Sequence, residues 1–419
     1  NLAKLVADKK VSVKTIDEAV KRILTKKFEL GLFDDPCRFS NEEREKQVLN
    51  KPEFIAAARD VARKSIVLLK NDKQLLPISK NLGSIALIGP MVKLKKENKG
   101  FWSLDVGDEN QVVSLYEGMQ EPAGNTKLLY ARGCDITDTS KVGFSDAVKT
   151  AMQADVVVMA MGELFDMTGE AKSRSNIHLP GVQEELIKAV VAAGKPVVVL
   201  LYAGRPMVFD WTADHAPAIV YTWWLGNQAG NAIADVLYGN YNPSAKLPIT
   251  FPRTEGQIPI YYNHYNTGRP SHADNDVNYT SAYIDLLNSP KFAFGHGLSY
   301  TTFKYDNLKL SKKSMFTTGN IIVSFDIENT GKYAGEEVAQ LYLRDLVSQP
   351  VRPIKELKDF KKLMLQPGEK KTISFTITKD KLAFYNDKLE RITQPGDFTL
   401  MIGSASDDIR LQDTFTLAN

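Results

Sequence analysis

Short runs of consecutive apolar residues alternate with amphipathic helical patterns from about residue 65 to residue 255, and this alternation constrains the fold more than any other feature. Such runs occupy residues 85–89, 155–162, 196–201 and 218–221. Between them, residues 180–194 place apolar side chains on one helical face and stop at glycine. Strands without polar alternation are buried on both faces, so the pattern predicts an α/β sandwich domain: a mostly parallel sheet with helices on both faces.

The pattern changes beyond about residue 305. Apolar and polar residues now alternate with a period of two over residues 321–327, 338–343 and 372–377. Turn signals separate these runs, at Asn329-Thr330-Gly331 and Pro367-Gly368. Strands at short intervals without intervening helices predict an all-β sandwich of fibronectin type III-like architecture.

The amino-terminal segment predicts a helix with an unpartnered apolar face. Thr15 and Glu18 have capping-box spacing, which places the helix start at Thr15, and Gly31 ends the helix. The apolar stripe consists of Ile16, Val20, Ile23, Leu24 and Phe28. Nothing else in the chain is an obvious partner for it, so we expect an exposed patch. A second helix is expected after Pro52. The chain opens inside a charged helical pattern. We therefore expect that its first residue corresponds to an internal position of a longer polypeptide.

Composition excludes several classes of function. The net charge is +3, and the densest basic run, Lys93–Lys96, is followed at once by Glu97, which is not the pattern of a nucleic-acid binder. No stretch of about 18 apolar residues is present, so no membrane span is expected. The two cysteines and five histidines have no metal-binding or redox spacing, and no metal or cofactor is predicted.

The loop that follows the run at 155–162 is the best candidate for chemistry. Ligands of open parallel sheets bind beyond the carboxyl ends of the strands, where this loop begins. Its sequence from Gly162 to Ser175 is rich in carboxylates and small residues. A carboxylic acid here could protonate a leaving oxygen. The alternative is a surface loop whose acids are merely solvated.

The whole chain resembles, in order, the carboxyl-terminal part of family 3 glycoside hydrolases, and the periplasmic β-glucosidases of bacteria in particular. The resemblance implies a domain division into a helical remnant of a barrel and linker (1–50), the α/β sandwich domain (51–255), an extended linker (256–304) and the β-sandwich (305–419). Five stretches carry the match, at residues 20–33, 64–71, 162–175, 224–252 and 294–301.

The resemblance also implies a chemistry. The family cleaves β-glycosidic bonds with retention, using two carboxylates. Carried onto this sequence, the acid/base is Glu170, and Glu163 supports the loop. Arg174 could orient Glu170 or hold its charge. Trp102 could line the cleft near the leaving group, although packing in the core or rim is the simpler interpretation.

One departure from the family pattern concerns the nucleophile. In the family this is an aspartate in a Ser-Asp-Trp-like motif on an amino-terminal TIM-like barrel. The sequence has no such motif, because Ser145-Asp146-Ala147 opens a predicted helix and Ser406-Asp407-Asp408 lies near the end of the sandwich. The chain is therefore expected to carry half of a catalytic pair and to be inactive alone.

The resemblance implies β-linked glucosides or oligosaccharides as substrates, the missing barrel of the same polypeptide as a partner, a possible homodimer, and a periplasmic or secreted location. The alternative is a non-catalytic carbohydrate-binding or adaptor protein built from the same accessory domains. Four further aromatic residues, Trp223, Trp224, His264 and His296, are expected to pack or to bond the backbone.

Overall fold

A computed structural model describes residues 1–49, 51–103, 111–271, 274 and 279–418. The chain divides into two compact units, residues 1–57 and 58–419. Within the described residues, no helix has the length and apolar character needed to cross a membrane.

The amino-terminal unit is helical. Its helices are α1 (Leu2–Ala7), α2 (Val13–Glu29) and α3 (Glu42–Val48), and α4 (Pro52–Ser65) begins in it. The predicted start of α2 at Thr15 is wrong, because the hydroxyl of Ser12 accepts the Thr15 amide at 3.1 Å and caps the helix earlier. Gly31, with φ +68°, follows the last turn as predicted.

The apolar stripe of α2 is mostly exposed, as predicted. Val20, Ile23, Leu24 and Phe28 are exposed, and Ile16 is half-buried. A shallow groove runs along this face and is lined by Val20, Leu24, Phe28 and Phe33, among others.

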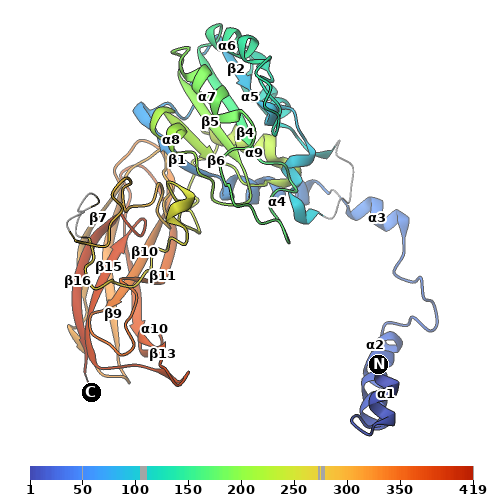
Figure 1. Cartoon of the computed structure of the whole chain (residues 1–419), viewed down its shortest axis with the longest axis vertical. Coiled ribbons are helices and arrows are strands. Elements are labelled where there is room, and N and C mark those ends of the chain that lie inside the picture. The colour runs from blue at the N-terminus through green and yellow to red at the C-terminus, as the bar shows by residue number, and fades with distance from the viewer. Residues whose placement is uncertain (50, 104–110, 272–273, 275–278, 419) are drawn as a thin grey trace. The chain divides into compact units, whose positions relative to one another are not determined.

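The second unit begins with a six-stranded sheet in the order β1-β6-β5-β4-β2-β3 (Figure 1). Strand β1 pairs antiparallel with β6, and the remaining pairs are parallel. The strands are β1 (Val67–Asn71), β2 (Ser84–Ile88), β3 (Lys127–Ala131), β4 (Val156–Gly162), β5 (Val197–Tyr202) and β6 (Ala218–Tyr221). Of these, β3 had not been predicted; its apolar run, Leu128–Ala131, is short and only partly buried.

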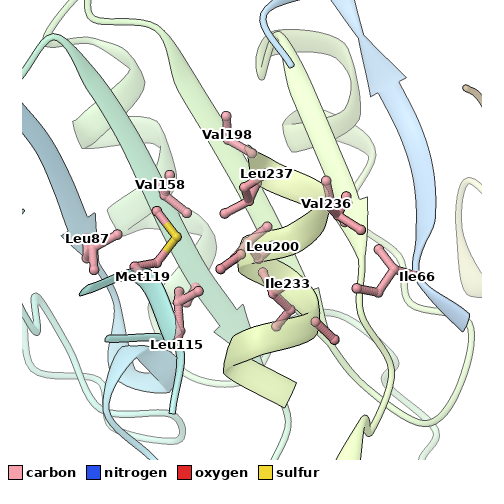
Figure 2. Packing of buried hydrophobic residues seen from close by; sticks show 14 of the residues in the cluster. Ile66, Leu87, Leu115, Met119, Val158, Val198, Leu200, Ile233, Val236 and Leu237 are labelled. Atoms are coloured by element: carbon pink, nitrogen blue, oxygen red, sulfur yellow. The ribbon is translucent and has the colours of Figure 1, made fainter. Parts of the chain in front are cut away.

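Helices cover both faces of this sheet, as the apolar runs predicted. On one face, Leu115 and Met119 of α5 and Ile233 of α9 pack against Val158 and Leu200 of the sheet (Figure 2). Helices α6, α7 and α8 contribute to the core of the other face. The helices are α5 (Leu115–Ala123), α6 (Phe144–Met152), α7 (Gln183–Val191), α8 (Asp210–His215) and α9 (Ala229–Leu237).

The carboxyl-terminal residues form a β-sandwich with its own core. One sheet has the order β11-β10-β15-β16-β8 and the other β12-β9-β7. Burial alternates along β9, whose inward side chains are Ile321, Val323, Phe325 and Ile327. The expectation of no helices needs one correction, because a single turn, α10 (Lys379–Leu382), follows β12. The strands are β7 (Phe303–Leu310), β8 (Ser314–Met315), β9 (Asn320–Asn329), β10 (Gly335–Asp345), β11 (Glu356–Leu365), β12 (Lys370–Thr378), β13 (Phe384–Tyr385), β14 (Arg391–Ile392), β15 (Gly396–Gly403) and β16 (Ile409–Leu417).

The segment between α9 and β7 joins the two domains through buried polar contacts. His296 is bonded through Nε2 to the carbonyl of Leu69 at 2.9 Å, as expected of a backbone-bonding histidine. The amide nitrogen of the Gln340 side chain donates to the carbonyl of Gly295 at 3.4 Å. The linking segment is thus tied to a sheet strand on one side and to the sandwich on the other.

Candidate active site

The loop predicted to carry chemistry begins at the carboxyl end of a central strand. Residue 163 follows the last residue of β4, and its amide donates to the carbonyl of Tyr202 at the end of β5 at 2.8 Å. The loops that follow β4 and β5 therefore start side by side, at the edge where parallel α/β sheets bind ligands.

Glu163 anchors this loop from inside the protein. Its carboxylate is completely buried. It accepts a hydrogen bond from the Thr168 hydroxyl at 2.6 Å and another from Nη1 of Arg174, and Nε of Arg205 lies 3.4 Å from its Oε1. A buried carboxylate is tolerated when charge partners and hydrogen bonds replace its water, and here two guanidinium groups and a hydroxyl do so.

Arg205 comes from the loop after β5 and binds the loop after β4. Its Nε donates to the Thr168 hydroxyl at 2.9 Å. Its Nη2 donates to the carbonyls of Met167 and Lys172, at 2.6 Å for the latter. This residue was not predicted from the sequence, since a single arginine after a strand matches no motif. Its only sequence signal was its place after a buried run next to the run that precedes the loop.

Glu170 occupies the exposed tip of the same loop. No described residue forms a hydrogen bond or ion pair with its carboxylate. The backbone turns sharply on both sides, because the Lys172 amide donates to the Gly169 carbonyl at 3.2 Å and Ala171 has φ +57°. The result is a solvent-facing carboxylate on a backbone fixed from beneath.

Arg174 does not contact Glu170. Its described hydrogen bonds go to Glu163 and, at 3.2 Å, to the carbonyl of His178. Direct orientation of Glu170 by Arg174, one of the two roles suggested from the sequence, is therefore not the arrangement found. The buried carboxylate of Glu163 takes the guanidinium because that carboxylate has no access to water.

Trp102 lies at the surface beside the loop. Its side chain is 66 % exposed, which excludes the core position considered from the sequence. Its ring packs edge-on against Phe101, with centroids 5.2 Å apart, and Nζ of Lys172 lies 5.8 Å from the Phe101 centroid. An exposed indole next to the loop of Glu170 is suited to stack on the apolar face of a sugar.

The other aromatic residues have the structural roles expected of them. Trp223 packs edge-on against Tyr221, and Trp224 packs against the sheet core. Nδ1 of His264 lies 3.0 Å from the carbonyl of Tyr265.

Comparison with known proteins places the chain in a family. The model described as the glycosyl hydrolase family 3 C-terminal domain matches residues 66–300, more than half of the chain. The chain belongs to glycoside hydrolase family 3. A fibronectin type III-like domain model matches residues 337–406. Both the resemblance and the fold class predicted from the sequence are confirmed.

Individual relatives in family 3 agree with this assignment. The chain is 42 % identical to a periplasmic β-glucosidase of Salmonella typhimurium over 99 % of its length, and 39 % identical to a β-xylosidase of Formosa agariphila over 95 %. A crystal structure of the β-glucosidase of Listeria innocua in complex with isofagomine superposes with a TM-score of 0.91 at 38 % identity, over the whole chain. The chain spans 57 %, 55 % and 57 % of the length of these three proteins, respectively.

Proposed function

We propose that this chain is the carboxyl-terminal portion of a retaining β-glucosidase that hydrolyses terminal β-D-glucosyl residues. In this proposal Glu170 is the acid/base, and the nucleophilic aspartate lies on a barrel domain outside the chain. The observation that carries the proposal is an exposed carboxylate, Glu170, on a loop held by a buried charge cluster at the carboxyl edge of the sheet.

The arrangement suits both half-reactions of a retaining enzyme. In the first, protonated Glu170 donates its proton to the glycosidic oxygen as the nucleophile attacks the anomeric carbon. In the second, the Glu170 carboxylate takes a proton from the water that cleaves the glycosyl–enzyme ester. Glu170 faces solvent without a described counter-ion and is free to reach a substrate, whereas Glu163 is buried and bound by two arginines.

Two details of the proposal follow from the relatives. A glucosidase and a xylosidase match at comparable identity, and we favour glucosides because the glucosidases of Salmonella typhimurium and Listeria innocua both match over essentially the whole chain. A periplasmic or secreted location follows from the likeness to the periplasmic enzyme of Salmonella typhimurium.

The proposal makes this chain inactive by itself. Without the nucleophile no glycosyl–enzyme intermediate can form, so the purified chain is expected to release no aryl alcohol from an aryl β-glucoside above the uncatalysed rate. Turnover of the purified chain at an ordinary glycosidase rate would contradict the division of the catalytic pair. If the full-length protein were inactive too, a carbohydrate-binding or adaptor protein would replace the enzyme.

The role of Glu170 is tested by substrates that differ in leaving group. In the full-length protein, Glu170→Gln is expected to lower kcat/KM on cellobiose by about 10²–10⁴-fold, because its alcohol leaving group needs protonation. A dinitrophenyl β-glucoside needs little protonation and should keep most of its kcat/KM. Asp166→Asn, which changes another exposed acid of the loop, is the matched control and should leave both values unchanged. Wild-type turnover of cellobiose by Glu170→Gln would show the assignment to be wrong.

A further inference from the structure

We propose that Arg205 is a positioning residue that fixes the backbone on both sides of Glu170 and thereby sets where the acid/base stands. This inference rests on the proposed function, because it gives Arg205 a role through Glu170.

The contacts of Arg205 bracket Glu170 in the chain. Its Nη2 donates to the carbonyl of Met167, before Glu170, and to the carbonyl of Lys172, after it. Its Nε donates to the Thr168 hydroxyl at 2.9 Å. One rigid, planar group therefore holds both ends of the turn that presents the glutamate, as the fixed fork of a guanidinium allows.

Arg205 is itself held in place. Only 17 % of its side chain is exposed, and its charge is balanced by the buried Glu163, with 3.4 Å between Nε and Oε1. Its own carbonyl accepts a hydrogen bond from the hydroxyl of the buried Tyr221. Burial raises the pKa of Tyr221 well above its ordinary value, so this hydroxyl remains a donor at all working pH values.

The two arginines of the cluster differ in what they hold. Arg174 connects Glu163 to the carbonyl of His178, beyond the loop tip, and has no described bond to the carbonyls that flank Glu170. Arg205 alone, among the described residues, bonds the backbone on both sides of it. Loss of Arg205 is thus expected to displace the acid/base, and displacements of about 1 Å can cost on the order of 10²-fold in rate.

The test compares variants of the full-length protein on the same two substrates. Arg205→Met is expected to lower kcat/KM on cellobiose by about 30–100-fold, and on a dinitrophenyl β-glucoside by less than about threefold, because only the first reaction needs a placed acid. Arg205→Lys keeps a charge and donors and should recover part of the loss. Arg391→Met, at an exposed arginine of the sandwich, is the matched control and should change neither.

A role confined to stability would lower the rates on both substrates together, and that result, or no change on either, would overturn the proposal. If Arg205→Met does not fold, Thr168→Val decides. This variant removes, at nearly constant volume, the hydroxyl that binds both Arg205 and Glu163, and a smaller loss limited to cellobiose is expected. Equal effects of Thr168→Val on both substrates would likewise overturn it. Failure of Glu170→Gln to discriminate between the substrates would instead refute the proposed function, so the two failures are distinguishable.

Discussion

Two glutamates of one loop have opposite surroundings, and the separate roles proposed for them rest on this contrast. Glu163 is buried and paired with two arginines, so its carboxylate is part of the structural framework of the loop. Glu170 is exposed and has no described partner, so its carboxylate is accessible from solvent. The sequence shows only two acids on a loop. Which of them is buried depends on Arg174 and on Arg205, which reaches the loop from another strand.

At the residue scale, contacts between residues that lie far apart along the chain are therefore the hardest to predict from the sequence. The candidate role of Glu170 was predicted from a motif, and the burial of β4 was predicted from its run of apolar residues. The bond from Arg205 to Met167 joins positions that only the pairing of β4 with β5 brings together. Local patterns carry no information on such a contact.

The surroundings of His296 predict how the free energy of unfolding depends on pH. Burial lowers the pKa of His296 below 6.5, an effect opposed by its bond to the Leu69 carbonyl and reinforced by nearby Lys246, with Asp407 and Asp408 acting to raise it. The unfolded chain thus binds a proton more readily than the folded chain. As pH falls below about 6.5, this site is expected to reduce the free energy of unfolding, by at most about 1.4 kcal/mol per pH unit.

The measurement is the free energy of unfolding of this chain between pH 5 and pH 8, for wild type and His296→Gln. Glutamine can still donate to the Leu69 carbonyl but does not titrate, so its curve should fall less steeply below pH 6.5, while the two remain parallel above pH 7. His264→Gln is the control, since that side chain is exposed. Parallel curves for wild type and His296→Gln throughout the range would refute the prediction.

At the scale of elements, apolar runs and periodicity predicted the central strands of the α/β sheet and three strands of the sandwich, whereas several helices and outer strands were not predicted. The run at 155–162 became β4, whereas β3, with Leu128, Leu129 and Tyr130 only partly buried, was not predicted. The start of α2 was misplaced because Ser12 and Thr15 both precede apolar positions. Their hydroxyls lie 2.8 Å apart, and only the backbone geometry shows which one caps the helix.

The exposed face of α2 gives a prediction for the full-length protein. If the barrel covers the groove, then Leu24 and Phe28 are buried in the full-length protein, where each contributes about 1.5–3 kcal/mol. Leu24→Asp with Phe28→Asp is expected to lower the free energy of unfolding of the full-length protein by about 4 kcal/mol or more. Thermal unfolding of the full-length variant measures the loss.

Val13→Asp serves as the control, because Val13 is exposed on the same helix but does not line the groove. It should change the unfolding of the full-length protein little. Equal Tm values for the double variant and wild type would show that the groove remains open to solvent. The hypothesis that the barrel packs on α2 would then be wrong.

At the scale of the whole molecule, the contact of the linking segment with the sandwich depends on a close approach at Gly295. This residue has φ +83°, and a Cβ here would lie 2.4 Å from Oε1 of the buried Gln340. Gly295→Ala is therefore expected to destabilise the chain by about 2–4 kcal/mol, from the left-handed backbone together with overpacking.

Gly368→Ala separates these two causes. Gly368 has φ +76° in a turn with nothing within 4 Å of the added atom, so only the backbone cost of about 1 kcal/mol is expected. Chemical denaturation of both variants gives the comparison. Equal losses would mean that Gln340 yields without cost and that the junction is not tightly packed.

Azide gives a sharp test of whether this chain supplies the acid/base and whether that acid/base is Glu170. In the full-length protein, Glu170→Ala should still be glycosylated by a dinitrophenyl β-glucoside but should deglycosylate slowly, since no base activates water. Azide needs no base, so it should restore turnover and yield a β-glucosyl azide, whereas Glu163→Ala should give none. A Glu170→Ala variant that azide does not accelerate, or a glucosyl azide formed by Glu163→Ala, would show that Glu170 is not the acid/base.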